Sequence, residues 1–127
     1  MARDPKTRPS VLAVDDDPAN LRVLSGLLRG RGFQLRVARS GEEALESVAY
    51  AAPDLILLDV VLGGIDGFET CRRLKANPEF ESIPVIFMTV LTGADHIQQA
   101  FDAGGVDYVR KPLVAEELVA RARTHIR

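Results

Sequence analysis

Short, continuously apolar runs alternate along the chain with longer segments whose apolar residues recur at helical spacing. Three of these runs, residues 11–14, 54–59 and 84–89, lack polar alternation, which is typical of strands buried on both faces of a parallel sheet. Residues 33–37 alternate between apolar and polar, and the apolar run at 107–110 is short. We therefore expect the last two strands at the edges of the sheet.

The segments between the strands carry helix start signals. Asp17 precedes Pro18, a residue that suits the first turn of a helix. Ser40-Gly-Glu-Glu43 forms a capping box, and Asp66 with Glu69 marks a third helix start. The predicted helices cover approximately residues 18–29, 41–51, 67–77, 93–103 and 114–126.

Five strands, each followed by a helix, predict an α/β fold of the (βα)5 type. Short right-handed crossovers between parallel strands place helices on both faces of the sheet. The strand order 2-1-3-4-5 puts the fully apolar strands in the centre and the other two at the edges. This is the flavodoxin-like, doubly wound order, whose ligand-binding switch point lies between strands one and three.

Length and composition narrow the class of protein. A chain of 127 residues fits one domain, and we expect a flexible N-terminal extension at residues 1–9 before a domain at 10–127. The net charge of −2, with both signs interspersed, does not favour direct nucleic-acid binding. No apolar run approaches the roughly 20 residues that span a bilayer, and the N-terminus lacks a signal-peptide pattern. A single cysteine, Cys71, excludes an internal disulfide, so we expect a cytoplasmic protein without membrane contact.

Chemically capable residues lie at the strand ends. Asp15 and Asp16 follow the first strand, Asp59 ends the third, Thr89 ends the fourth and Lys111 follows the fifth. Because strands one and three flank the switch point, the three carboxylates should converge. Like charges that lie this close favour a neutralising cation, and an oxygen-rich site suits Mg²⁺. A cation-bound aspartate beside a lysine and a hydroxyl predicts phosphoryl transfer to a carboxylate.

The same residues lie in segments that resemble the receiver domain of two-component response regulators. The similarity runs from about residue 11 to residue 127. The matching segments are residues 11–18, 55–59 with Asp66-Gly67, 84–89 and 103–112.

The resemblance implies roles for the acidic residues. Asp59 would accept a phosphoryl group from a histidine kinase or a phosphotransfer protein in a Mg²⁺-dependent step. Asp15 and Asp16 would hold the metal together with Asp59 and the backbone carbonyl of Val61. We expect Asp16 to bind the ion directly and Asp15 to bind it mainly through water.

The resemblance also implies a phosphoacceptor switch, which assists its own phosphorylation and dephosphorylation, and not an enzyme with a separate substrate. Thr89 and Lys111 would contact the phosphoryl group, and Tyr108 would change position with Thr89. The output face would be formed by the fourth helix, the fifth strand and the fifth helix. The fourth helix has few apolar anchors beyond Ile97 and Phe101, so we expect it to be the least stable helix. Charges that could pair across a homodimer on this face are Asp102, Asp107, Arg121 and Arg123.

Two glycines depart from the family pattern. Gly63 stands where the family commonly has proline, which predicts a looser loop after Asp59. Gly105 adds a second glycine before the fifth strand, and we expect it to loosen that turn. The turn that aims Lys111 back at the carboxylates predicts a cis bond between Lys111 and Pro112.

Three other functions are compatible with parts of the pattern. A phosphatase with an aspartate nucleophile would use Asp15 and Asp17, but Ala19 stands where such enzymes have Thr or Val. A flavin-binding protein would need a phosphate-binding loop after the first strand, where three aspartates repel phosphate instead. A receiver-like interaction module that acts without phosphorylation is the third alternative. His96 and His125 are isolated in the sequence, and we expect them at the surface.

Overall fold

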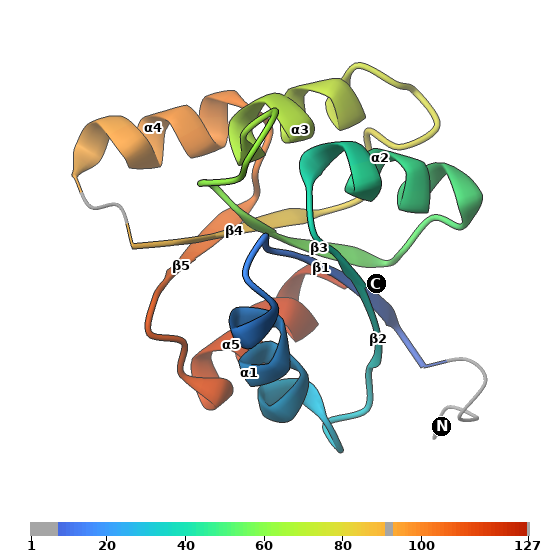
Figure 1. Ribbon diagram of the computed structural model, residues 1–127, viewed down its shortest axis with the longest axis vertical. Coiled ribbons are helices and arrows are strands. Elements are labelled where there is room, and N and C mark those ends of the chain that lie inside the picture. Colours follow the sequence, from blue (N-terminus) through green and yellow to red (C-terminus); the bar gives the residue numbers. More distant parts are fainter. Residues whose placement is uncertain (1–7, 91–92, 127) are drawn as a thin grey trace.

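The structure, a computed structural model, describes residues 8–90 and 93–126. Its strands form one parallel sheet in the order β2-β1-β3-β4-β5, so the predicted doubly wound topology is confirmed. Helices α2, α3 and α4 cover one face of the sheet, and α1 and α5 cover the other (Figure 1). The strands are β1 (Ser10–Val14), β2 (Gln34–Ala38), β3 (Leu55–Asp59), β4 (Val85–Thr89) and β5 (Asp107–Arg110). The helices are α1 (Pro18–Leu28), α2 (Gly41–Tyr50), α3 (Gly67–Lys75), α4 (Ala94–Asp102) and α5 (Ala115–His125).

The central strand β3 contributes side chains to two separate cores, one on each face of the sheet. Leu55 and Leu57 pack in the core beneath α1 and α5, whereas Ile56 and Leu58 pack in the core beneath α2, α3 and α4. All four side chains are fully buried, and each contributes roughly 1.5–3 kcal/mol relative to an exposed position. This two-sided burial explains why the apolar run has no polar alternation.

Side chains cap three helices at the positions that the sequence predicts. An oxygen of Asp17, of Ser40 and of Asp66 accepts a backbone N–H two or three residues farther on, at 2.9, 3.0 and 2.8 Å. Cys71 is buried in α3. Residues 1–7 of the predicted N-terminal extension lie outside the described residues. Across residues 8–90 and 93–126, no helix is long and apolar enough to cross a membrane.

Helix α4 is weakly anchored to the rest of the domain. Ala100 is its only buried residue, whereas each of the other helices buries at least three. The prediction that Phe101 anchors this helix is wrong, because its side chain is 46% exposed, and Ile97 is only partly buried. No side chain caps the helix at Gly93. With so little buried apolar surface, α4 is expected to have a low local stability.

The glycine pair before β5 tightens the turn, contrary to the prediction of a looser one. Gly105 is buried, and a Cβ atom at this position would lie 2.7 Å from the ring of Phe87 and 3.0 Å from the carbonyl oxygen of Ala100. Its neighbour Gly104 has a φ of +106° and lies against the aliphatic stem of Lys75. The two glycines therefore allow the end of α4 to approach β4 closely.

Replacing Gly105 with alanine should destabilise the domain, since the added methyl group would press against Phe87 and the α4 backbone. We expect a loss of about 1–3 kcal/mol in the free energy of unfolding, the usual cost of overpacking a core. Urea denaturation followed by circular dichroism measures it. Gly26→Ala is the matched control, because nothing lies within 4 Å of its added Cβ and alanine favours a helix. Equal stability of both variants would contradict this packing role.

Candidate functional site

The carboxyl edge of the sheet brings three carboxylates together. Asp15 and Asp16 directly follow β1, and Asp59 is the last residue of the neighbouring strand β3. One oxygen of each carboxylate lies within 4.8 Å of the other two. Asp15 and Asp59 are buried, whereas Asp16 is exposed to solvent. The convergence that strand order predicts is present in the structure.

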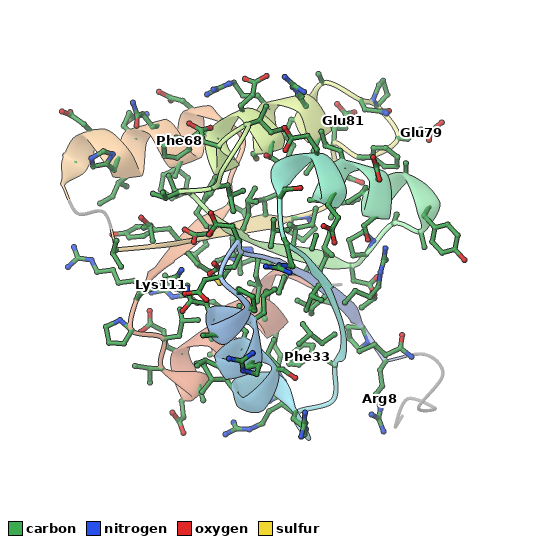
Figure 2. The ribbon with its side chains drawn as sticks, in the orientation of Figure 1. Arg8, Phe33, Phe68, Glu79, Glu81 and Lys111 are labelled. Carbon is green, nitrogen blue, oxygen red and sulfur yellow. The ribbon has the colours of Figure 1, made fainter. Side chains whose placement is uncertain are left out.

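Lys111 bridges the two buried carboxylates. Its Nζ atom lies 2.8 Å from Oδ2 of Asp15 and 3.0 Å from Oδ2 of Asp59. The predicted cis bond to Pro112 is confirmed, and the backbone N–H of Lys111 donates to the carbonyl oxygen of Thr89 at 2.9 Å. Figure 2 shows the labelled Lys111 side chain extending from the β5 end toward the middle of the sheet edge. Two of the three carboxylates thus share one ammonium group.

Burial and charge act in opposite directions on the central ion pair. Burial raises the pKa of Asp59, and the charge of Asp15 raises it further, although the hydrogen bond and charge of Lys111 lower it. Burial disfavours the charged form of Lys111, but its hydrogen bonds to Asp15 and Asp59 and the charges of these carboxylates together outweigh burial and raise its pKa. The lysine is therefore held as ammonium, and the cluster keeps an excess of negative charge.

Backbone and amide donors orient the remaining carboxylate oxygens. The N–H of Val61 donates to Oδ1 of Asp59 at 3.2 Å, which places the backbone of Val61 beside the cluster. Oδ1 of Asp15 accepts from the side-chain amide of Asn20 at 3.4 Å. Sequence reasoning missed Asn20, although its place in the first turn of α1, five residues after Asp15, was a usable signal.

Gly63 contacts the third carboxylate of the cluster. Its N–H donates to Oδ2 of Asp16 at 3.2 Å, across 47 positions of sequence. The sequence predicted only a looser loop at this position, because the residue type says nothing about where the N–H points. The contact ties the loop after β3 to the loop after β1.

Thr89 and Tyr108 border a narrow cavity of about 10 Å³ between β4, β5 and α4. The hydroxyl-bearing Thr89 ends β4 and is buried. Ile97 and His96 of α4 line the same cavity. The surface location predicted for His96 is wrong, since the residue is half-buried and its Nδ1 has no hydrogen-bond partner among the described residues. The cavity is too small for an aromatic ring unless the surrounding side chains or helices move.

Several charges on the face formed by α4, β5 and α5 are paired within the chain. Nη1 of Arg121 lies 3.0 and 2.9 Å from the two oxygens of Asp107, and Nε2 of His125 lies 3.3 Å from Oδ2. Burial of Asp107 opposes its charge, but the hydrogen bonds from Arg121, the Tyr108 backbone and His125, together with the charge of Arg121, outweigh burial and lower the pKa of Asp107. Arg123 donates to the carbonyl oxygen of Arg31 at 3.0 Å. His125 is thus partly exposed, and Asp107 is its partner.

The sheet order and the strand-end cluster together define a class of protein. The sequence pattern of the response regulator receiver domain matches residues 11–123. The chain therefore belongs to the response regulator receiver domain family, the receiver domains of two-component systems.

Relatives and solved structures agree with this family. The DNA-binding response regulator MtrA of Mycolicibacterium smegmatis is 39% identical over 94% of this chain and 51% of its own length. Response regulator PleD of Caulobacter vibrioides is 40% identical over 90% of this chain and 25% of its own length. The chain thus spans about half of MtrA and a quarter of PleD. The chemotaxis protein CheY4 of Vibrio cholerae superposes with a TM-score of 0.89, at 26% identity, over 94% of this chain and 100% of that one.

A receiver domain from a signal transduction histidine kinase is also similar. This domain, from Syntrophus aciditrophicus, has a TM-score of 0.85 and 31% identity, and the match covers 92% of this chain and 89% of that one. The same receiver fold is therefore similar both to response regulators and to a domain of a kinase.

Replacing Lys111 with methionine should raise the pKa of Asp59 above its wild-type value. Methionine keeps much of the side-chain length but removes the hydrogen bond and the charge that lower this pKa. Carbon-13 NMR of the aspartate carboxyls in metal-free buffer measures the titration midpoint. Arg110→Met removes an exposed cation one residue away and serves as the control. A midpoint in Lys111→Met at or below the wild-type value would show that Lys111 does not set the charge of Asp59.

Proposed function

We propose that Asp59 is the phosphoryl acceptor of a two-component switch, with a histidine kinase or a phosphotransfer protein as the donor. The observation that carries the proposal is the geometry of Asp59: it ends a buried strand, binds Lys111 at 3.0 Å and lies beside two further carboxylates. Because the fold holds Asp59 at an open sheet edge, the side of the carboxylate that faces away from the core is available to a donor. The predicted domain limits, 10–127, and the cytoplasmic location stay predictions.

The acidic cluster fits a divalent cation. Three carboxylates within 4.8 Å against a single lysine leave net negative charge, and all the donors are oxygens, which Mg²⁺ prefers. Asp15, Asp16 and Asp59 would hold the ion together with the backbone carbonyl of Val61. When bound, Mg²⁺ would neutralise the charge that develops on the phosphoryl oxygens.

Three residues of this chain would have different roles in phosphoryl transfer. A carboxylate oxygen of Asp59 attacks phosphorus while the bond from phosphorus to the donor nitrogen breaks, and its electron pair stays on the imidazole of the donor. Lys111, which is fixed by two carboxylates, supplies a positive charge next to the incoming oxygens. The hydroxyl of Thr89 would donate a hydrogen bond to the phosphoryl group. Hydrolysis by water in the same site would return the chain to its starting state, so the domain acts on itself.

Movement of Thr89 would convert phosphorylation into a change of surface. If Thr89 moves toward the phosphoryl group, it leaves space on its other side, next to the cavity that Tyr108 lines. The ring of Tyr108 can use that space only when α4 yields, and α4 buries a single residue. The output face would therefore consist of α4, β5 and α5, coupled to the site as a two-state element.

The proposal includes a homodimer through the face formed by α4, β5 and α5. Fewer charges on this face are available to pair across a dimer than the sequence implied. Asp107 and Arg121 neutralise each other within the chain, whereas the two acidic residues of α4, Asp95 and Asp102, are exposed. A dimer would need the intramolecular pair to exchange partners, which gains little at exposed positions.

The rival phosphatase function is not favoured by the geometry. Asp17, which would have to act as the general acid, instead accepts the N–H of Ala19 as the cap of α1. The pair of Asp59 and Lys111 would have no task in that mechanism.

Asp59→Asn should abolish formation of an acid-labile phosphoryl adduct. Asparagine keeps the shape of the side chain but is a poor nucleophile, so incubation with acetyl phosphate and Mg²⁺ should label only the wild-type chain. Intact-mass and peptide mass spectrometry measure the adduct. Asp54→Asn, at the other end of β3, is the control and should label normally. Adduct in Asp59→Asn, or equal wild-type labelling in EDTA, would refute the proposed site.

Beryllofluoride, a mimic of the phosphoryl group, should change amide hydrogen exchange in α4, β5 and α5. The reason is that α4 is the helix with the least buried apolar surface and borders the Thr89–Tyr108 cavity. Exchange followed by mass spectrometry, with and without the mimic, measures the change. Strand β2 and helix α2 are internal controls and should not respond. Changes confined to the loops around Asp59 would mean that the output face is elsewhere.

A further inference from the structure

Asp16 differs from the other two carboxylates of the cluster in how it is held. Asp15 and Asp59 are buried and paired with Lys111, whereas Asp16 is exposed. Among the described residues, Asp16 has no ion pair, and its side chain accepts one hydrogen bond, from the N–H of Gly63 at 3.2 Å. The orientation of Asp16 therefore depends on the backbone of another loop.

From this contact we propose that Gly63 is a positioning residue, whose backbone N–H holds Asp16 in place for Mg²⁺. The inference rests on the proposed function, because it concerns the same metal site. An exposed carboxylate beside two others is repelled by them and, if it were free, would rotate toward solvent. The N–H of Gly63 opposes this rotation and fixes the side chain before the ion arrives.

Residue 63 can donate this hydrogen bond only if it is not proline. Proline has no N–H, and receivers commonly have proline at this position. The structure does not require glycine at position 63. No atom lies within 4 Å of a Cβ built there, and the φ of Gly63 is not positive. Alanine would therefore fit and would still donate, so the N–H can be removed or retained by choice of residue.

The loop that carries Gly63 is also held from its other side. The carboxylate of Glu42 in α2 accepts the N–H of Ile65 at 3.4 Å and lies against Gly64, whose φ is +76°. The loop is thus fixed to α2 at one point and to Asp16 at another. Because Val61 belongs to the same loop and its N–H contacts Asp59, a shift of the loop would change the contacts to Asp16 and Asp59 together.

The test compares Mg²⁺ affinity in the wild-type chain, Gly63→Pro and Gly63→Ala by isothermal titration calorimetry. We expect Gly63→Pro to raise the Kd about fivefold, or about 1 kcal/mol, the usual net contribution of a hydrogen bond. Gly63→Ala keeps the N–H and should retain the wild-type Kd within about twofold. If the wild-type chain does not bind Mg²⁺, the proposed function fails. If it binds and the proline variant binds equally well, or the alanine variant is equally weakened, only the positioning role fails.

If Gly63→Pro does not fold, the hydrogen bond from Gly63 to Asp16 can be tested with Gly63 left unchanged. In the variant Asp16→Ala, in metal-free buffer, the NMR signal of the Gly63 amide proton should shift upfield relative to the wild-type chain. The reason is that the Asp16 carboxylate, which accepts this hydrogen bond, is gone. Asp54→Ala, which lies at the opposite end of β3, should leave it unchanged. A Gly63 amide that does not respond to Asp16→Ala would overturn the inference, whatever the calorimetry gives.

Discussion

The ion pair of Lys111 with Asp15 and Asp59 is the interaction on which the site depends. Two buried carboxylates would repel each other and take up protons, and the ammonium group at 2.8 and 3.0 Å offsets that repulsion. Asp15 and Asp59 come from the ends of β1 and β3, which are adjacent because the chain crosses over after β2 and returns beside β1. Lys111 follows β5, and its side chain reaches the two carboxylates from beyond β4. The fold therefore assembles the charges, and neither the strands nor the loops could do so separately.

Stability is distributed unevenly around this site. The strands β1, β3 and β4 are buried along most of their length, so the acidic edge is a rigid support. Helix α4 buries one residue and has no side-chain cap, and its contact with β4 relies on the close approach at Gly105. A change at the rigid acidic edge should therefore displace α4, because α4 is the least firmly held element around the site.

Sequence reasoning found the parts of the structure that depend on local pattern. The two-sided burial of Leu55 to Leu58 follows from an unbroken apolar run, and the cap at Ser40 follows from its own neighbours. It failed where a residue's surroundings come from distant segments. The packing of Gly105 on Phe87, the exposure of Phe101 and the partner of His125 depend on how helices sit on the sheet. Those positions are set by tertiary packing and are not encoded in residue spacing.

Charge balance explains why a neutral residue would carry the signal. Phosphorylation adds roughly 1.5–2 negative charges at pH 7 to a cluster that already exceeds its single lysine. Lys111 is held by two carboxylates and can move little without leaving one of them unpaired in a buried place. Thr89 carries no charge, so turning it toward new acceptor oxygens would leave no buried charge unpaired. The space that Thr89 leaves adjoins a cavity of about 10 Å³, too small for the ring of Tyr108. In the proposed switch, a movement of the Tyr108 ring would therefore involve α4, whose residues line the same cavity.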